Sequence, residues 1–117
     1  MLSGDATLKV IGKMLDGCAA RHNAIAANLA NAETPGYKRV DVRFEDQLAK
    51  AIDSGNTGEI DAVHPETVRG SGTARPDGNT VDFGTELGNL NRNTLVFSTF
   101  ADLAAVRIRQ YREAIGE

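Results

Sequence analysis

Residues 28–39 read NLANAETPGYKR, and this run determines where the first helix of the chain ends. Pro35 disfavours a helical conformation at the residue before it. The pair Pro35-Gly36 suits the central positions of a type II turn, the second of which has a positive φ. Asn28 and Asn31 fall in the last turn of this helix, where we expect their side chains to bond to free carbonyls or to act as caps. The run therefore predicts a helix, a tight turn and an extended exit.

Upstream of the turn, apolar residues recur at alternating intervals of three and four, which is the spacing of a coiled-coil seam. The seam positions are Leu8, Ile11, Leu15, Cys18, His22, Ile25 and Leu29. The flanking positions are rich in alanine, whose small side chain allows another helix to pack closely. We expect a long N-terminal helix that, with its closing turn, occupies residues 1–34.

The same spacing returns near the C-terminus and predicts a second long helix over residues 83–117. Its seam positions are Phe83, Leu87, Leu90, Thr94, Phe97, Ala101, Ala104, Ile108, Tyr111 and Ile115. Asp82 stands where an N-cap would be. Beside the seam, Val96, Phe100 and Leu103 form a further apolar stripe, wider than a two-helix contact needs. Two seams predict a mainly α fold in which the helices pair, and the stripe predicts additional partners.

Residues 35–82, between the two predicted helices, lack the apolar spacing of a long helix. An alternation at Val40, Val42 and Phe44 predicts a short strand or extended arm, followed by one or two helical turns. Residues 53–82 are rich in Gly, Ser, Thr, Asn and Asp, and they contain too few apolar residues to offset the entropy of ordering them. We therefore expect residues 35–82 to be an extended arm and a flexible, largely irregular loop within a single domain of residues 1–117.

Length and composition narrow the class of protein. The chain has 117 residues, a mass of 12.5 kDa and a formal charge of −3, which suits one small domain with no general attraction to nucleic acid or anionic membranes. One cysteine excludes an intrachain disulfide. No apolar run is long enough to span a membrane or to form a signal peptide. We expect that the protein either stays in the cytoplasm or is exported by a pathway that does not use a cleavable signal peptide.

Candidate chemical sites are weak. Cys18 and His22 have the spacing of metal ligands, and His64 could supply a further ligand. However, Cys18 and His22 occupy seam positions, where packing between helices explains them better than metal binding does. The glycines around residues 70–72 lack the context of a phosphate-binding loop, and residues 77–82 do not match a calcium loop. We expect no catalytic, metal-binding or cofactor-binding residues.

The run at 28–39 closely resembles the N-terminal signature of the rod, hook and distal-rod proteins of the bacterial flagellum. The matching residues are Asn28, Ala30, Asn31, Thr34, Pro35, Gly36, Tyr37 and Lys38. With a later run, DGNTVD at residues 77–82, the chain is most similar to the proximal rod members of this family.

The resemblance implies a non-enzymatic structural subunit without cofactors. Its terminal helices would pair as an antiparallel coiled coil and assemble with copies of itself and other rod proteins into a helical tube that transmits torque across the periplasm. Val96, Phe100 and Leu103 and the alanine face of the first helix would contact neighbouring subunits. Other implied partners are basal-body ring and junction proteins and the flagellar type III export apparatus, which exports such chains without a cleaved signal. Nucleic acid binding and membrane insertion are not implied.

Two alternatives remain open from the sequence. One is another rod paralogue of the same family. The other is a soluble coiled-coil adaptor that binds a partner helix through its second apolar stripe and has no role in flagella.

Overall fold

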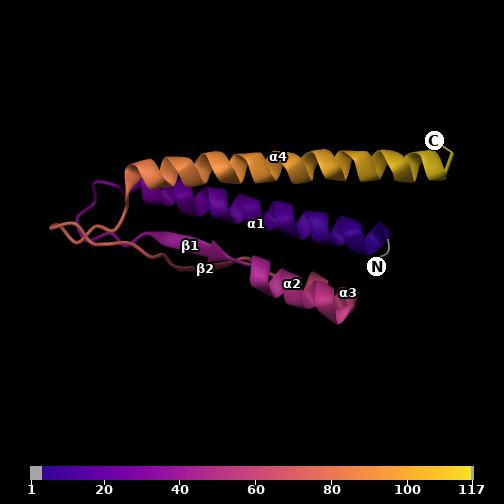
Figure 1. The fold of residues 1–117 in the computed structure, drawn as a ribbon, viewed down its shortest axis with the longest axis horizontal. Helices are drawn as coiled ribbons and strands as arrows, with labels where there is room; N and C mark the ends of the chain where they lie inside the picture. The colour runs from indigo at the N-terminus through magenta and orange to yellow at the C-terminus, as the bar shows by residue number, and fades with distance from the viewer. Residues whose placement is uncertain (1–3, 117) are drawn as a thin grey trace.

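The computed structural model describes residues 4–116, except for the side chain of Asp5, and has three layers (Figure 1). In chain order the elements are α1 (Gly4–Ala30), β1 (Val40–Arg43), α2 (Glu45–Ser54), α3 (Thr57–Asp61), β2 (Glu66–Arg69) and α4 (Phe83–Ala114). α1 forms the middle layer. α4 lies along one side of it, and residues 40–69, which we call the side layer, lie along the other. The molecule measures 61 × 28 × 15 Å.

The two long helices run antiparallel, so both ends of the described chain lie at the same end of the molecule (Figure 1). Halfway along the pair, Asn93 Nδ2 donates a hydrogen bond to the carbonyl of Cys18 at 2.8 Å. Near the termini, the side chain of Tyr111 lies so close to Gly4 that a Cβ there would overlap it. The prediction of a mainly helical fold with paired terminal helices is confirmed.

On α1, the predicted seam is buried or half-buried at six of its seven positions. Ile11, Cys18 and Ile25 are 5%, 1% and 3% exposed, and the three leucines of the seam are half-buried. His22 is exposed. An apolar pattern was therefore sufficient to find the α1 side of the contact.

On α4, the side that faces α1 differs from the predicted seam. Glu86 and Asn93, seven residues apart, are 0% and 6% exposed, and Phe100 and Arg107 continue this spacing as half-buried residues. Polar side chains occupy three of these four positions, so a search for apolar periodicity passes over them. At these four positions the contact lies one residue earlier in the heptad than the pattern predicted, while Leu90, Ala101 and Ala104 of the predicted seam are half-buried.

The displaced seam residues are exposed instead. Leu87, Phe97 and Ile108 are 41%, 41% and 45% exposed, while Leu90 is half-buried. The predicted second stripe is also only partly at the surface. Val96 and Phe100 are half-buried, and Leu103 is 44% exposed. The available apolar surface of α4 is therefore mostly made of residues that were assigned to the seam.

The side layer replaces much of the predicted irregular loop. β1 and β2 pair antiparallel from Val40↔Arg69 to Arg43↔Glu66, and the predicted strand and helical turns after residue 40 are confirmed as β1 and α2. The irregular loop predicted from residue 53 was wrong for α3 and β2. Ile60 and Val63 suffice to hold this region because they join Leu48 in a cluster whose other wall is α1.

One aromatic ring of the side layer packs directly on the backbone of α1. Phe44 is 1% exposed and its ring lies on Gly17, where a Cβ would overlap three ring carbons. Arg21 covers the ring at 5.0 Å and forms two hydrogen bonds to the carboxylate of Glu45. Gly17 is therefore required by the close approach of the two layers.

Among the described residues, no helix has both the length and the apolar character that crossing a membrane requires.

Candidate functional site

The run that ends α1 forms the predicted turn. The Tyr37 amide donates to the carbonyl of Thr34 at 3.2 Å, and Gly36 has a φ of 75°, as a type II turn with Pro35 and Gly36 at its centre requires. Asn31 Nδ2 bonds to the carbonyl of Ala27 at 2.9 Å, in agreement with its expected role at the helix end. These residues stop the helix and reverse the chain.

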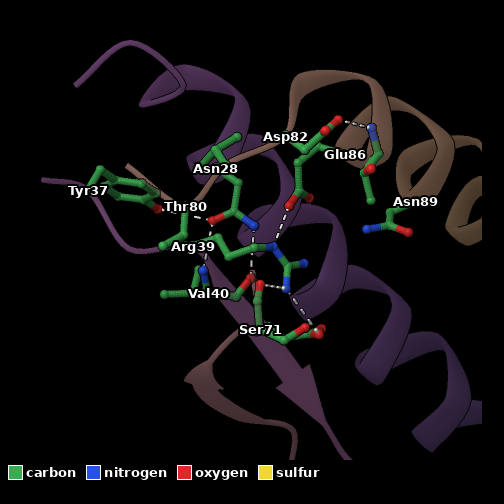
Figure 2. Close-up of polar contacts among 12 residues, drawn as sticks. Asn28, Tyr37, Arg39, Val40, Ser71, Thr80, Asp82, Glu86 and Asn89 are labelled. Carbon is green, nitrogen blue, oxygen red and sulfur yellow. Dashed lines mark hydrogen bonds and ion pairs between the residues drawn. The ribbon is translucent and has the colours of Figure 1, made fainter. Parts of the chain in front are cut away.

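Asn28 has a different role from the one predicted. Its side chain is fully buried and bonds to the backbone of Val40 beyond the turn: Nδ2 donates to the carbonyl and Oδ1 accepts from the amide, both at 2.8 Å. The Tyr37 hydroxyl also donates to Oδ1, at 3.2 Å (Figure 2). Asn28 therefore acts as a strand partner that fixes the direction in which the chain leaves α1.

The second motif, residues 77–82, lies directly against the first. Asn79 is fully buried, and its Nδ2 approaches the carbonyls of Asn31, Ala32 and Thr34 at 2.9, 3.2 and 2.8 Å. The Gly36 amide donates to the carbonyl of Asp77 at 2.8 Å, and Lys38 Nζ donates to the carbonyl of Gly78. The two motifs that carried the family resemblance thus form one structure.

A buried ion pair joins this structure to α4. Arg39 Nε donates to Glu86 Oε1 at 2.6 Å, and the Arg39 amide donates to Thr80 Oγ1 at 2.9 Å (Figure 2). Glu86 Oε2 has no hydrogen-bond partner among the described residues. Sequence reasoning missed both members of the pair. The available signal was a carboxylate within an otherwise apolar heptad pattern, one residue before Leu87.

Asp82 begins α4 as predicted. Its carboxylate accepts a hydrogen bond from the Thr85 amide at 2.9 Å, and this bond, with a second contribution from the Thr85 side chain, lowers the pKa of Asp82. An ionised cap of this kind also suits the positive end of the helix dipole.

Cys18 lies in the interface between α1 and α4. Burial raises the pKa of its thiol, which disfavours the reactive thiolate. Among the side chains described within residues 4–116, which leave out that of Asp5, no three of His, Cys, Asp or Glu gather as metal ligands would. The buried polar groups of this region bond to backbone and to each other, an arrangement that fixes the relative positions of chain segments.

Comparisons with known proteins agree with this structural role. A family model described as "Flagella basal body rod protein" matches residues 19–38, the last half of α1 and the turn. The flagellar basal body rod protein FlgB of Cereibacter sphaeroides is 34% identical over 105 residues, 81% of this chain and 82% of the relative. The protein of the same name from Borrelia hermsii is 28% identical over 112 residues, 80% and 83% of the two chains.

The class defined by the fold, the turn motif and these matches is that of the flagellar basal body rod proteins, which are structural components of the motility apparatus. Within this class, the chain belongs to the FlgB family. The resemblance drawn from residues 28–38 and 77–82 is confirmed.

Proposed function

We propose that this protein is a self-assembling subunit of the proximal rod. In this proposal the whole chain forms one axial domain, α1 and α4 pair as an antiparallel coiled coil, and copies stack with other rod proteins into a helical tube. The tube crosses the periplasm and transmits torque. The chain reaches it through the flagellar type III export apparatus, and basal-body ring and junction proteins are its further neighbours.

The observation that carries the proposal is the outer flank of α4, defined as Phe83, Leu87, Phe97 and Ile108. These side chains are 53%, 41%, 41% and 45% exposed, and α4 has α1 on one side only. Apolar surface of this extent gains about 25 cal/mol per Å² when it is removed from water. A row of such residues on a long helix is typical of a surface that neighbouring subunits cover.

A complementary feature lies on the adjoining surface of α1. A groove of about 400 Å³ runs between α1 and α4, and its wall includes Ala19, His22 and Phe97. Exposed alanines at 26 and 30 continue the small-residue surface of α1. Large side chains on one helix and small ones on the other favour a contact between different faces of two copies. Such a contact generates a helical filament when the rotation between successive copies does not close a ring.

The test is a strain whose only copy of the gene carries both Leu87→Asp and Phe97→Asp. Both side chains lie on the outer flank and are 41% exposed, so the purified variant should remain folded with the helix content of the natural protein, while swimming and complete basal bodies are lost. Asn91→Asp, also exposed on α4 but outside the flank, is the matched control and should swim normally. Normal swimming and complete basal bodies with the double variant would refute assembly through this flank.

A further inference from the structure

We propose that residues 75–82 are a clasp that completes the turn after α1 and the start of α4 in a single step, with Asn79 as the positioning residue. The end of α1 and the direction of the side layer are then conditional on a segment more than forty residues further along the chain. This conformational device does not depend on the proposed role in the rod.

The first step is that the turn after α1, residues 31–36, does not bond all of its own carbonyls. Pro35 prevents the helix from continuing over these carbonyls. The turn provides short-range bonds, such as that from the Thr34 amide to the carbonyl of Asn31. The carbonyl of Ala32, whose residue is 6% exposed, is reached by Asn79 and by Arg75 Nη2. Without the clasp, this buried carbonyl would lose both side-chain donors.

The second step is that the same two side chains hold the start of α4. Asn79 Oδ1 accepts from the Val81 amide at 2.7 Å, and Arg75 Nη1 donates to the Val81 carbonyl at 2.5 Å. Val81 is 2% exposed and is followed directly by the N-cap Asp82. Each clasp side chain therefore bonds to the turn after α1 and to the residue that leads into α4.

The third step concerns the side layer. The Thr80 amide donates to the carbonyl of Tyr37 at 3.0 Å, and Thr80 Oγ1 accepts from the Arg39 amide. When the clasp opens, the exit from α1 loses these bonds as well. Buried polar groups left without partners are costly, so the three parts should open and close together.

The experiment is hydrogen–deuterium exchange of the purified full chain, followed by mass spectrometry of its peptides. Asn79→Asp keeps the oxygen that accepts from Val81 but places a second oxygen against three carbonyls. We expect amides in residues 28–40 and 80–89 to exchange about tenfold faster or more, by similar factors, with little change in residues 8–20. Asn56→Asp is the matched control, because the oxygen that accepts from Gly58 is retained.

A second variant covers the case in which Asn79→Asp unfolds. Arg75→Ala removes the bonds to Ala32 and Val81 but leaves Asn79 in place, and it should speed exchange in the same two segments by a smaller factor. Faster exchange confined to residues 75–82 in either variant would overturn the proposal, since the segment would then be only a local turn. Natural exchange rates with Asn79→Asp would overturn it as well.

Discussion

Gly17→Ala should destabilise the protein, although alanine is the better helix former. Gly17 is buried within α1, where the ring of Phe44 occupies the space that a Cβ would need. The ring cannot rotate away as a long flexible side chain would, because it is 1% exposed and Arg21 lies over its face. The methyl group must therefore push Phe44 and the start of α2 away from α1.

The magnitude follows from two opposing effects. Replacing glycine by alanine inside a helix stabilises it by about 1 kcal/mol. Overpacking a buried site costs about 1–3 kcal/mol, and loss of all the packing of a buried phenylalanine costs about 3–5 kcal/mol. Because a rigid ring is displaced, we expect a value between these limits and a net loss of about 2 kcal/mol. For a domain of this size, the loss corresponds to a thermal midpoint lower by about 8 °C.

The assay is thermal and urea unfolding of the purified chain, monitored by circular dichroism. Gly12→Ala is the matched control, since no atom lies within 4 Å of the added Cβ, and it should raise the free energy of unfolding by about 0.5–1 kcal/mol. In a Phe44→Ala background, Gly17→Ala should cost nothing or stabilise, because the clash is gone. A Gly17→Ala protein as stable as Gly12→Ala would refute the close approach of the two layers.

Two further predictions concern titratable groups. The hydrogen bond from Arg21 lowers the pKa of Glu45 below its usual 4.5, so the pair stabilises the fold fully above that value and loses its effect as the pH falls through the lowered pKa. Glu45→Gln should therefore lower the thermal midpoint at pH 7, by an amount that shrinks toward pH 3; a constant difference across this range would contradict the ion pair. Because burial raises the pKa of Cys18, iodoacetamide at pH 8 should modify the folded protein at least tenfold more slowly than the urea-unfolded chain. Equal rates would show that the thiol is not protected by α4.

The positions of the two long helices could be predicted because their apolar spacing persists over many turns. The contact side of α4 could not be predicted in the same way. Asn93 is buried there because it bonds to the Cys18 carbonyl, and Glu86 because it pairs with Arg39. Such pairings join residues far apart in the chain, and the apolar pattern of a helix does not identify the partner of a polar residue within it.

The side layer was underestimated for a related reason. Residues 53–82 contain too little apolar surface to fold alone. The prediction of an irregular loop was wrong for part of this segment because it left out the surface of α1. α1 provides the opposite wall, with Val10 and Met14 packed against Leu48 and Ile60. A short segment can be ordered by few apolar residues when a preformed helix supplies the other half of the contact.

The candidate site shows what a motif does and does not predict. The turn at Pro35 and Gly36 followed from backbone geometry alone and was correct. The contact between Asn79 and the carbonyls after α1 was not predictable, because a polar residue in a glycine-rich loop is usually solvated. Full burial of Asn28 and Asn79 explains why asparagine stands at both positions: a neutral amide can donate to carbonyls and accept from backbone amides at the same time.

In the proposed rod, folding and assembly would depend on different surfaces of this chain. Substitutions at Gly17 or Phe44 disturb the contact between α1 and the side layer, which is complete within one molecule. Substitutions at Leu87 or Phe97 alter the outer flank of α4, where each side chain is 41% exposed. If neighbouring subunits cover this flank, the second group should abolish assembly while the chain remains folded, whereas the first should reduce stability and assembly together. The two groups of variants can separate a failure to fold from a failure to assemble.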